Sequence, residues 1–267
     1  MVQKMAPALF AGAISLFGAG CATDYPEAQR LLALQQLPDA LRVIDHCLGL
    51  EPRRTPGLVL KGNLLYLLSR DSEAIALLED ILTREPAQAD VRYALGRIYY
   101  ATGRHPQAVE QFEAVTRAEP AHYRAWDNLG LALEGVGRVD DAIKAHLESI
   151  KLVSTDHKDY DWPYANLAEL LMKQNQNRRA FDLAVEAVER NSSSARNAYL
   201  AGKSLTRLDK WPQAERWLRR SAELDARYPE PHYLLGQLLV RAGQREQADR
   251  EFTLFKDLRA AEPEKRR

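Results

Sequence analysis

The apolar residues of 89–122 recur with the period of an α-helix in two consecutive stretches. Leu95, Ile98 and Tyr99 lie in the first stretch, and Val109, Phe112 and Val115 lie in the second. Gly103 and Pro106 lie between them, where a left-handed helix end and a first helical residue are needed. The pattern predicts two antiparallel amphipathic helices joined by a short turn. Equivalent helix ends are expected at Gly137, Asn175 and Gly243.

This two-helix pattern repeats along the chain at a step of 34 residues, with one step of 38. A small residue recurs at Ala40, Ala74, Ala108, Ala142, Ala180, Ala214 and Ala248, and a second at Ala28, Gly62, Gly96, Gly130, Ala168, Gly202 and Gly236. We expect each pair to mark the closest approach of two helices. The units span 21–54, 55–88, 89–122, 123–156, 161–194, 195–228 and 229–262, with an insertion at 157–160 and a charged tail at 263–267. The expected fold is all-α: a single α-solenoid domain of seven antiparallel helix pairs.

The unit resembles the tetratricopeptide repeat, whose pattern is matched by Leu95, Gly96, Tyr99, Ala108, Phe112 and Pro120, and in the next unit by Trp126, Leu129, Gly130 and Ala142. The resemblance implies a right-handed superhelix whose first helices line a concave groove for a peptide segment or partner subunit. The groove positions transfer to Tyr66, Tyr93, Arg97, Tyr100, Arg124, Trp162, Tyr199, Lys203 and Tyr233, with Asn128 and Asn166 placed to hold peptide backbone. Two alternatives stay open: the tyrosines pack against the next repeat, and the asparagines make capping or turn contacts.

The first twenty residues have the pattern of an export signal. Lys4 precedes an apolar run from Met5 to Ala19, and small residues follow. Gly18-Ala19-Gly20-Cys21 resembles the bacterial lipoprotein box, although that box usually has Leu where Gly18 stands. The resemblance implies cleavage before Cys21, lipid on Cys21, and a membrane-anchored protein on the periplasmic face of an outer membrane. The alternative is a secreted or periplasmic soluble protein.

Composition and motifs favour no catalytic chemistry. The 37 basic and 37 acidic side chains cancel and are interspersed, which disfavours nucleic-acid binding. The six histidines follow no metal-site spacing and are expected in turns, at the groove edge or on the surface, and Asp156, Asp159 and Asp161 are expected in a solvated loop. No cofactor or metal is expected. Cys47 falls at an apolar core position and is expected to be a buried thiol.

The last helix should have an unpartnered apolar face. Phe252, Phe255 and Leu258 lie on it, and no eighth helix pair follows. We expect a partner protein or a second copy of the chain to cover this face. The expected function is that of a non-enzymatic protein-interaction scaffold. The alternatives are a structural lipoprotein that helps to assemble an envelope complex such as a pilus or secretion system, and a regulatory subunit of an enzyme on another chain.

Overall fold

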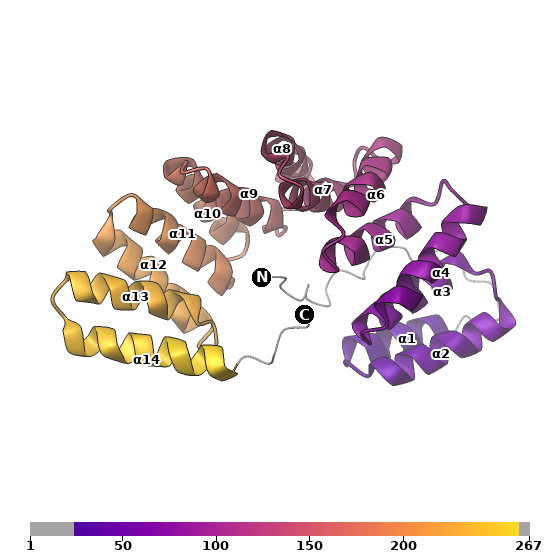
Figure 1. Cartoon of the computed structure of the whole chain (residues 1–267), viewed down its shortest axis with the longest axis horizontal. Coiled ribbons are helices and arrows are strands. Elements are labelled where there is room, and N and C mark those ends of the chain that lie inside the picture. The colour runs from indigo at the N-terminus through magenta and orange to yellow at the C-terminus, as the bar shows by residue number, and fades with distance from the viewer. Residues whose placement is uncertain (1–23, 262–267) are drawn as a thin grey trace. The chain divides into compact units, whose positions relative to one another are not determined.

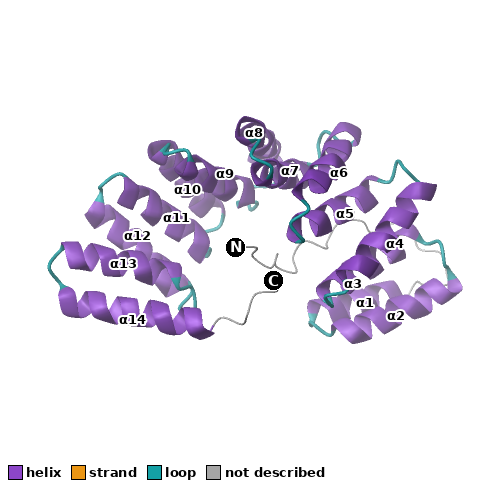
Figure 2. Cartoon of the chain, viewed as in Figure 1, coloured by secondary structure: helices purple, strands orange, loops and turns teal. Residues whose placement is uncertain are grey.

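The computed structural model describes residues 24–261, and all the regular structure in that range is helical (Figure 2). The helices of the first compact unit, which ends at Arg138, are α1 (Asp24–Ala33), α2 (Leu37–Leu50), α3 (Thr55–Leu67), α4 (Asp71–Arg84), α5 (Ala89–Ala101), α6 (His105–Ala118) and α7 (Tyr123–Gly135). The second unit begins at Val139 and contains α8 (Val139–Asp156), α9 (Trp162–Lys173), α10 (Asn177–Arg190), α11 (Ala195–Arg207), α12 (Trp211–Leu224), α13 (Glu230–Arg241) and α14 (Arg245–Ala261). The prediction of an all-α chain of helix pairs is confirmed.

Consecutive helices pack side by side within each unit (Figure 1). First helices also contact the next first helix: α5 contacts α3 and α7, and α11 contacts α9 and α13. Side chains on successive first helices therefore share one surface, which we call the first-helix face. This face positions the candidate site in each unit.

The small residues of the repeat lie where the two helices of a pair meet. All seven repeat alanines are fully buried. A Cβ added to Gly96 would lie 2.9 Å from Cε1 of Phe112, and one added to Gly202 would lie 2.8 Å from Cγ of Leu218. The glycine thus makes room for a large side chain sixteen residues later on the second helix. The expected close approach is present, and its physical reason is this packing of a large side chain against bare backbone.

The turn within each pair is made by a residue in the left-handed conformation. Gly103, Gly137, Asn175 and Gly243 have φ values of 75°, 78°, 57° and 75°, as the sequence predicted. At Gly103 the helix ends in a Schellman motif, because the Gly103 N–H donates to the Tyr100 carbonyl at 3.1 Å and the Arg104 N–H to the Tyr99 carbonyl at 2.8 Å. Gln35, Ser69 and Asp209 occupy the same repeat position with φ values of 60°, 66° and 57°. Sequence reasoning missed these three because none is glycine or asparagine.

The region of the insertion is solvated at Asp156 and Asp159, as expected, but not at Asp161. α8 has 18 residues where α6 has 14, so the extra residues add about one helical turn. Asp161, at the end of the loop, is buried, and its Oδ2 accepts a hydrogen bond from Asn197 Nδ2 at 2.6 Å. The carboxylate of Asp161 therefore joins α11 to the start of α9, and the prediction of a solvated Asp161 was wrong.

Two histidines and Cys47 also differ from their predicted environments. His146 is fully buried at the position that Phe112 occupies two helices earlier, and His232 is buried with its Nδ1 2.7 Å from Glu251 Oε2. Both are core residues rather than turn, groove-edge or surface residues. Cys47 is fully buried, as expected, but it is disulfide-bonded rather than a thiol. The other cysteine of the chain, Cys21, lies outside the described residues.

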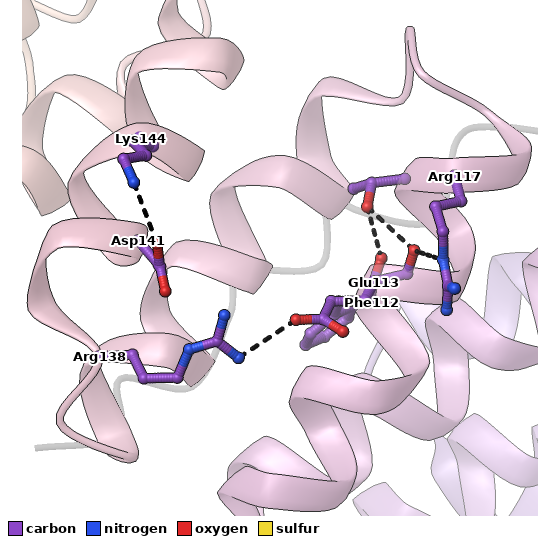
Figure 3. A network of polar contacts seen from close by, with 7 residues as sticks. Phe112, Glu113, Arg117, Arg138, Asp141 and Lys144 are labelled. Carbon is purple, nitrogen blue, oxygen red and sulfur yellow. Dashed lines mark hydrogen bonds and ion pairs between the residues drawn. The ribbon is translucent and has the colours of Figure 1, made fainter.

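The outer surfaces of the second helices carry exposed ion pairs. The Arg138 guanidinium lies 3.3 Å from the Glu113 carboxylate in the first unit, and the Lys144 ammonium lies 3.2 Å from the Asp141 carboxylate in the second. Figure 3 marks both ion pairs with dashed lines. Such exposed pairs each stabilise a protein by about 1 kcal/mol or less. They keep these surfaces soluble and contribute little to the choice of fold.

Candidate functional site

The first-helix face of the second unit holds a polar and aromatic cluster on α9 and α11. Arg196 Nη2 donates to Asn166 Oδ1 at 3.0 Å and to Glu169 Oε2 at 2.9 Å. The Arg196 guanidinium also lies over the Trp162 ring, 5.6 Å from its centroid. Burial acts to raise the pKa of Glu169, but the charge and hydrogen bonds of Arg196 outweigh it and lower that pKa. Arg196 and Glu169 are therefore held as an ion pair beside a half-buried tryptophan.

Lys203 extends this cluster along α11. Its Nζ lies 5.4 Å from the centroid of the Tyr199 ring, and the Tyr228 ring packs edge-on against Tyr199 at 5.4 Å. Burial lowers the pKa of Lys203 and raises the pKa of Tyr199 and of Tyr228. No ion pair involves Lys203 in the described part of the chain, and Glu169 is already bound to Arg196. The charges of Glu169 and Glu230 act on the half-buried ammonium, but neither carboxylate pairs with it directly.

The first unit has a second cluster, on α5 and α7. The Tyr93 hydroxyl accepts a hydrogen bond from Asn128 Nδ2 at 3.1 Å, and the Tyr93 ring lies 4.8 Å from the ring of His122. Asn128 also donates to the Arg124 carbonyl at 2.8 Å. Burial raises the pKa of the Tyr93 phenol. Tyr93 and Asn128 are thus hydrogen-bonded to each other across two consecutive repeats.

The remaining predicted residues are more dispersed. Arg97 lies 5.9 Å from the Tyr93 centroid, and Arg124 lies 5.4 Å from that of Tyr123. Tyr100 packs against His105 at 5.4 Å, and Tyr66 is half-buried on α3. Tyr233 is 43% exposed and contacts Phe252 and Phe255. The structure therefore groups Trp162, Asn166, Tyr199 and Lys203 in one unit and Tyr93, Arg97, Arg124 and Asn128 in the other.

Sequence reasoning missed His122 and Tyr228, which cover Tyr93 and Tyr199. Both occupy the last position of their units, one residue before α7 for His122 and two residues before α13 for Tyr228. His122 also caps α7, because its Nδ1 accepts the Ala125 N–H at 3.1 Å. An aromatic residue at this recurring position is a signal that the repeat register alone could have revealed.

Within residues 24–261, no group of three or more His, Cys, Asp or Glu side chains is arranged to hold a metal ion. No helix of that same range combines the length and the apolar character needed to cross a bilayer.

Comparisons with known proteins place these helices in a recognised fold. Tetratricopeptide repeat models match residues 93–156 and 229–252, and the model of anaphase-promoting complex (cyclosome) subunit 3 matches residues 150–221. No curated protein matches the sequence significantly. MamA (residues 41 to the end) from Desulfovibrio magneticus RS-1 is 19% identical with a TM-score of 0.57, over 66% of this chain and 97% of that one.

PilF from Pseudomonas aeruginosa has a TM-score of 0.68 at 17% identity, over 80% of this chain and 95% of PilF. Identities this low establish the fold and nothing about the partner. The family models agree with the register of small residues and with the left-handed turns. The chain therefore carries tetratricopeptide repeats and has the all-α solenoid fold of proteins built from them.

Proposed function

We propose that this chain is a non-enzymatic interaction scaffold that binds a peptide segment or partner subunit on the first-helix face of α9 and α11. The observation that carries the proposal is the cluster of Trp162, Tyr199, Arg196 and Lys203, all half-buried on that face. Aromatic side chains give a large contact area for little loss of conformational entropy, and such residues dominate the binding energy of interfaces. The tetratricopeptide fold supports this use of the surface.

The charges of the cluster indicate what the partner brings. Arg196 forms an ion pair with Glu169, whereas Lys203 forms no direct ion pair within the described residues and only feels the charges of Glu169 and Glu230. Burial outweighs the charges of Glu169 and Glu230 and lowers the pKa of the ammonium, and a carboxylate paired directly with it would favour the charged form again. We therefore expect the bound segment to place an aspartate or glutamate side chain at Lys203, next to the Tyr199 ring.

A matched pair of tryptophans tests the proposed surface. Trp162 on α9 lies under Arg196, and Trp217 on α12 lies under Arg220 at a similar centroid distance, 5.6 Å against 5.8 Å. Quantitative pull-downs from the source cells should lose the specific partner with Trp162→Ala, by roughly tenfold or more in recovery, and keep it with Trp217→Ala. Far-UV circular dichroism checks that both variants are folded.

Tyr93→Ala probes the cluster of the first unit in the same assay. Because Tyr93 is engaged by Asn128 and His122, we expect this variant to lower recovery less than Trp162→Ala does. Unchanged recovery of the partner with both Trp162→Ala and Tyr93→Ala would contradict the proposal that the first-helix face is the binding surface. It would favour the alternative in which the chain stabilises an envelope complex through other surfaces.

We also propose that the first twenty residues export the chain. Their Lys4 and apolar run support it, and so does the disulfide at Cys47, because disulfides persist in oxidising compartments outside the cytosol. Lipidation of Cys21 stays a prediction, since Cys21 lies outside the described residues. A thioether-linked lipid and a disulfide to Cys47 exclude each other at Cys21, because each uses its one sulfur atom.

Metabolic labelling with a palmitate analogue decides the fate of Cys21. If Cys21 is lipidated, the wild type and Cys47→Ser are labelled and Cys21→Ser is not. The Cys47→Ser variant is the matched control, because it removes the disulfide and leaves the sulfur of Cys21. Equal labelling of wild type and Cys21→Ser would remove the lipoprotein prediction. A mobility difference between reduced and non-reduced wild type that disappears in Cys21→Ser would then assign this sulfur to an internal disulfide.

A further inference from the structure

The outer face of α14 differs from the corresponding face inside the array. In α6, Val109, Phe112 and Thr116 are buried, and α6 packs against the following first helix, α7. The equivalent residues of α14 are Asp249, Phe252 and Lys256; Phe252 is half-buried and the two charged residues are exposed. The last repeat thus keeps the central aromatic residue and has opposite charges where α6 has the neutral residues Val109 and Thr116.

Tyr233 on α13 has the same packing against its second helix as Tyr93 has, but its ring is less covered. Its ring lies 6.0 Å from Phe252 at an interplanar angle of 56°, and the equivalent Tyr93 lies 6.0 Å from Phe112 at 59°. Tyr93 is covered by His122 from the end of its own unit, whereas Tyr233 is 43% exposed. A surface cavity of about 510 Å³ is lined by Tyr233, Asp249, Phe252, Thr253, Phe255 and Lys256. Leu258, which the sequence grouped with the two phenylalanines, does not line it.

We propose that α14 pairs antiparallel with α14 of a second copy of the chain, about a two-fold axis between Phe252 and Thr253. Asp249 lies three residues before Phe252, and Lys256 lies three residues after Thr253. The two-fold axis therefore places Asp249 of each copy opposite Lys256 of the other. Neither side chain has an ion pair within the described residues. The face is self-complementary in charge, as an isologous contact requires.

Charge also decides between a second copy and an ordinary next repeat. In α6 the following first helix covers the neutral residues Val109 and Thr116, and in α12 the charged residue equivalent to Asp249, Glu215, is paired with Arg219 on its own helix. Such a helix would bury Asp249 and Lys256 without counter-charges, which is costly. A second copy supplies the counter-charge at both ends and covers Tyr233 and Phe252 between them. This inference does not depend on the first-helix face of α9 and α11.

Charge reversal on the intact mature chain tests the dimer. Sedimentation equilibrium should show dimers of the wild type at tens of micromolar, weakened by salt because the pairs are at the surface. Asp249→Lys and Lys256→Asp should each raise the dimer dissociation constant by roughly tenfold, since each turns two attractions into two repulsions. The double variant Asp249→Lys/Lys256→Asp should restore the wild-type constant. An equimolar mixture of the two single variants should form a heterodimer.

Asp257→Lys is the matched control, because Asp257 is exposed on α14 and does not line the cavity. It should leave the dimer unchanged, and circular dichroism should show all variants equally helical. A wild type that stays monomeric up to about 100 μM would overturn the proposal and leave α14 as a polar cap of the array. Dimers that the single reversals do not weaken, or that the double variant does not restore, would overturn it as well.

Discussion

At the scale of single residues, the repeat uses one backbone conformation seven times with different side chains. The left-handed position holds glycine three times, and Gln35, Ser69, Asn175 and Asp209 at the others. In a residue that has a Cβ, this conformation brings the Cβ too close to a backbone carbonyl oxygen, and asparagine and aspartate tolerate the clash best. The sequence predicts the position through its glycines, but the cost at the other residues follows only from the observed φ.

Replacing Ser69 with glycine should therefore increase the stability of the protein. Ser69 has a φ of 66° and is exposed, so Ser69→Gly removes the steric cost without removing a packed side chain. We expect it to stabilise the protein by about 0.5–1 kcal/mol, seen as a higher urea midpoint. Asn175→Gly is the control and should change stability less, because asparagine is already tolerated there. A lower midpoint for Ser69→Gly would show that strain at this position is negligible.

At the scale of elements, helix pairs close through complementary volumes. Gly202 faces Leu218, and Gly96 faces Phe112. In the fifth pair, both positions are small and fully buried: Ala168 on α9 and Ala184 on α10. The helices meet at comparable positions in these pairs, but the size of the residue on the second helix varies with the size of the facing residue on the first helix.

This complementarity makes a swap testable on α9 and α10. Ala184→Leu alone should overpack the crossing and cost roughly 1–3 kcal/mol, because both Ala168 and Ala184 are fully buried and the larger side chain must displace its neighbours. Adding Ala168→Gly recreates the pairing of Gly202 with Leu218 and should recover most of the loss. Thermal or urea unfolding of the single and double variants measures both effects. Equal stability of the two variants would argue against direct packing of these positions.

At the scale of the whole molecule, the chain has no net charge, but some of its charged side chains form ion pairs and others do not. Exposed pairs such as Lys144 with Asp141 join neighbouring residues of the same second helix. Lys203 on α11 and the pair Asp249 and Lys256 on α14 have no such partners among the described residues. These groups set the two proposed contacts: an acidic segment at Lys203 and a second copy at α14. The pull-down and the charge reversal test them independently.

The sequence by itself determined the helices, the repeat register and the turns, because helical period, small residues and left-handed endings depend on neighbours within one unit. The resemblance to the tetratricopeptide repeat also predicted that Trp162, Tyr199 and Lys203 share one surface. Tertiary structure alone decided which polar groups are already satisfied. Asn128 is bound to Tyr93, Asp161 is buried against Asn197, and His146 fills a core position. Those contacts join residues about 35 positions apart, and their geometry depends on how consecutive repeats pack, which no local pattern encodes.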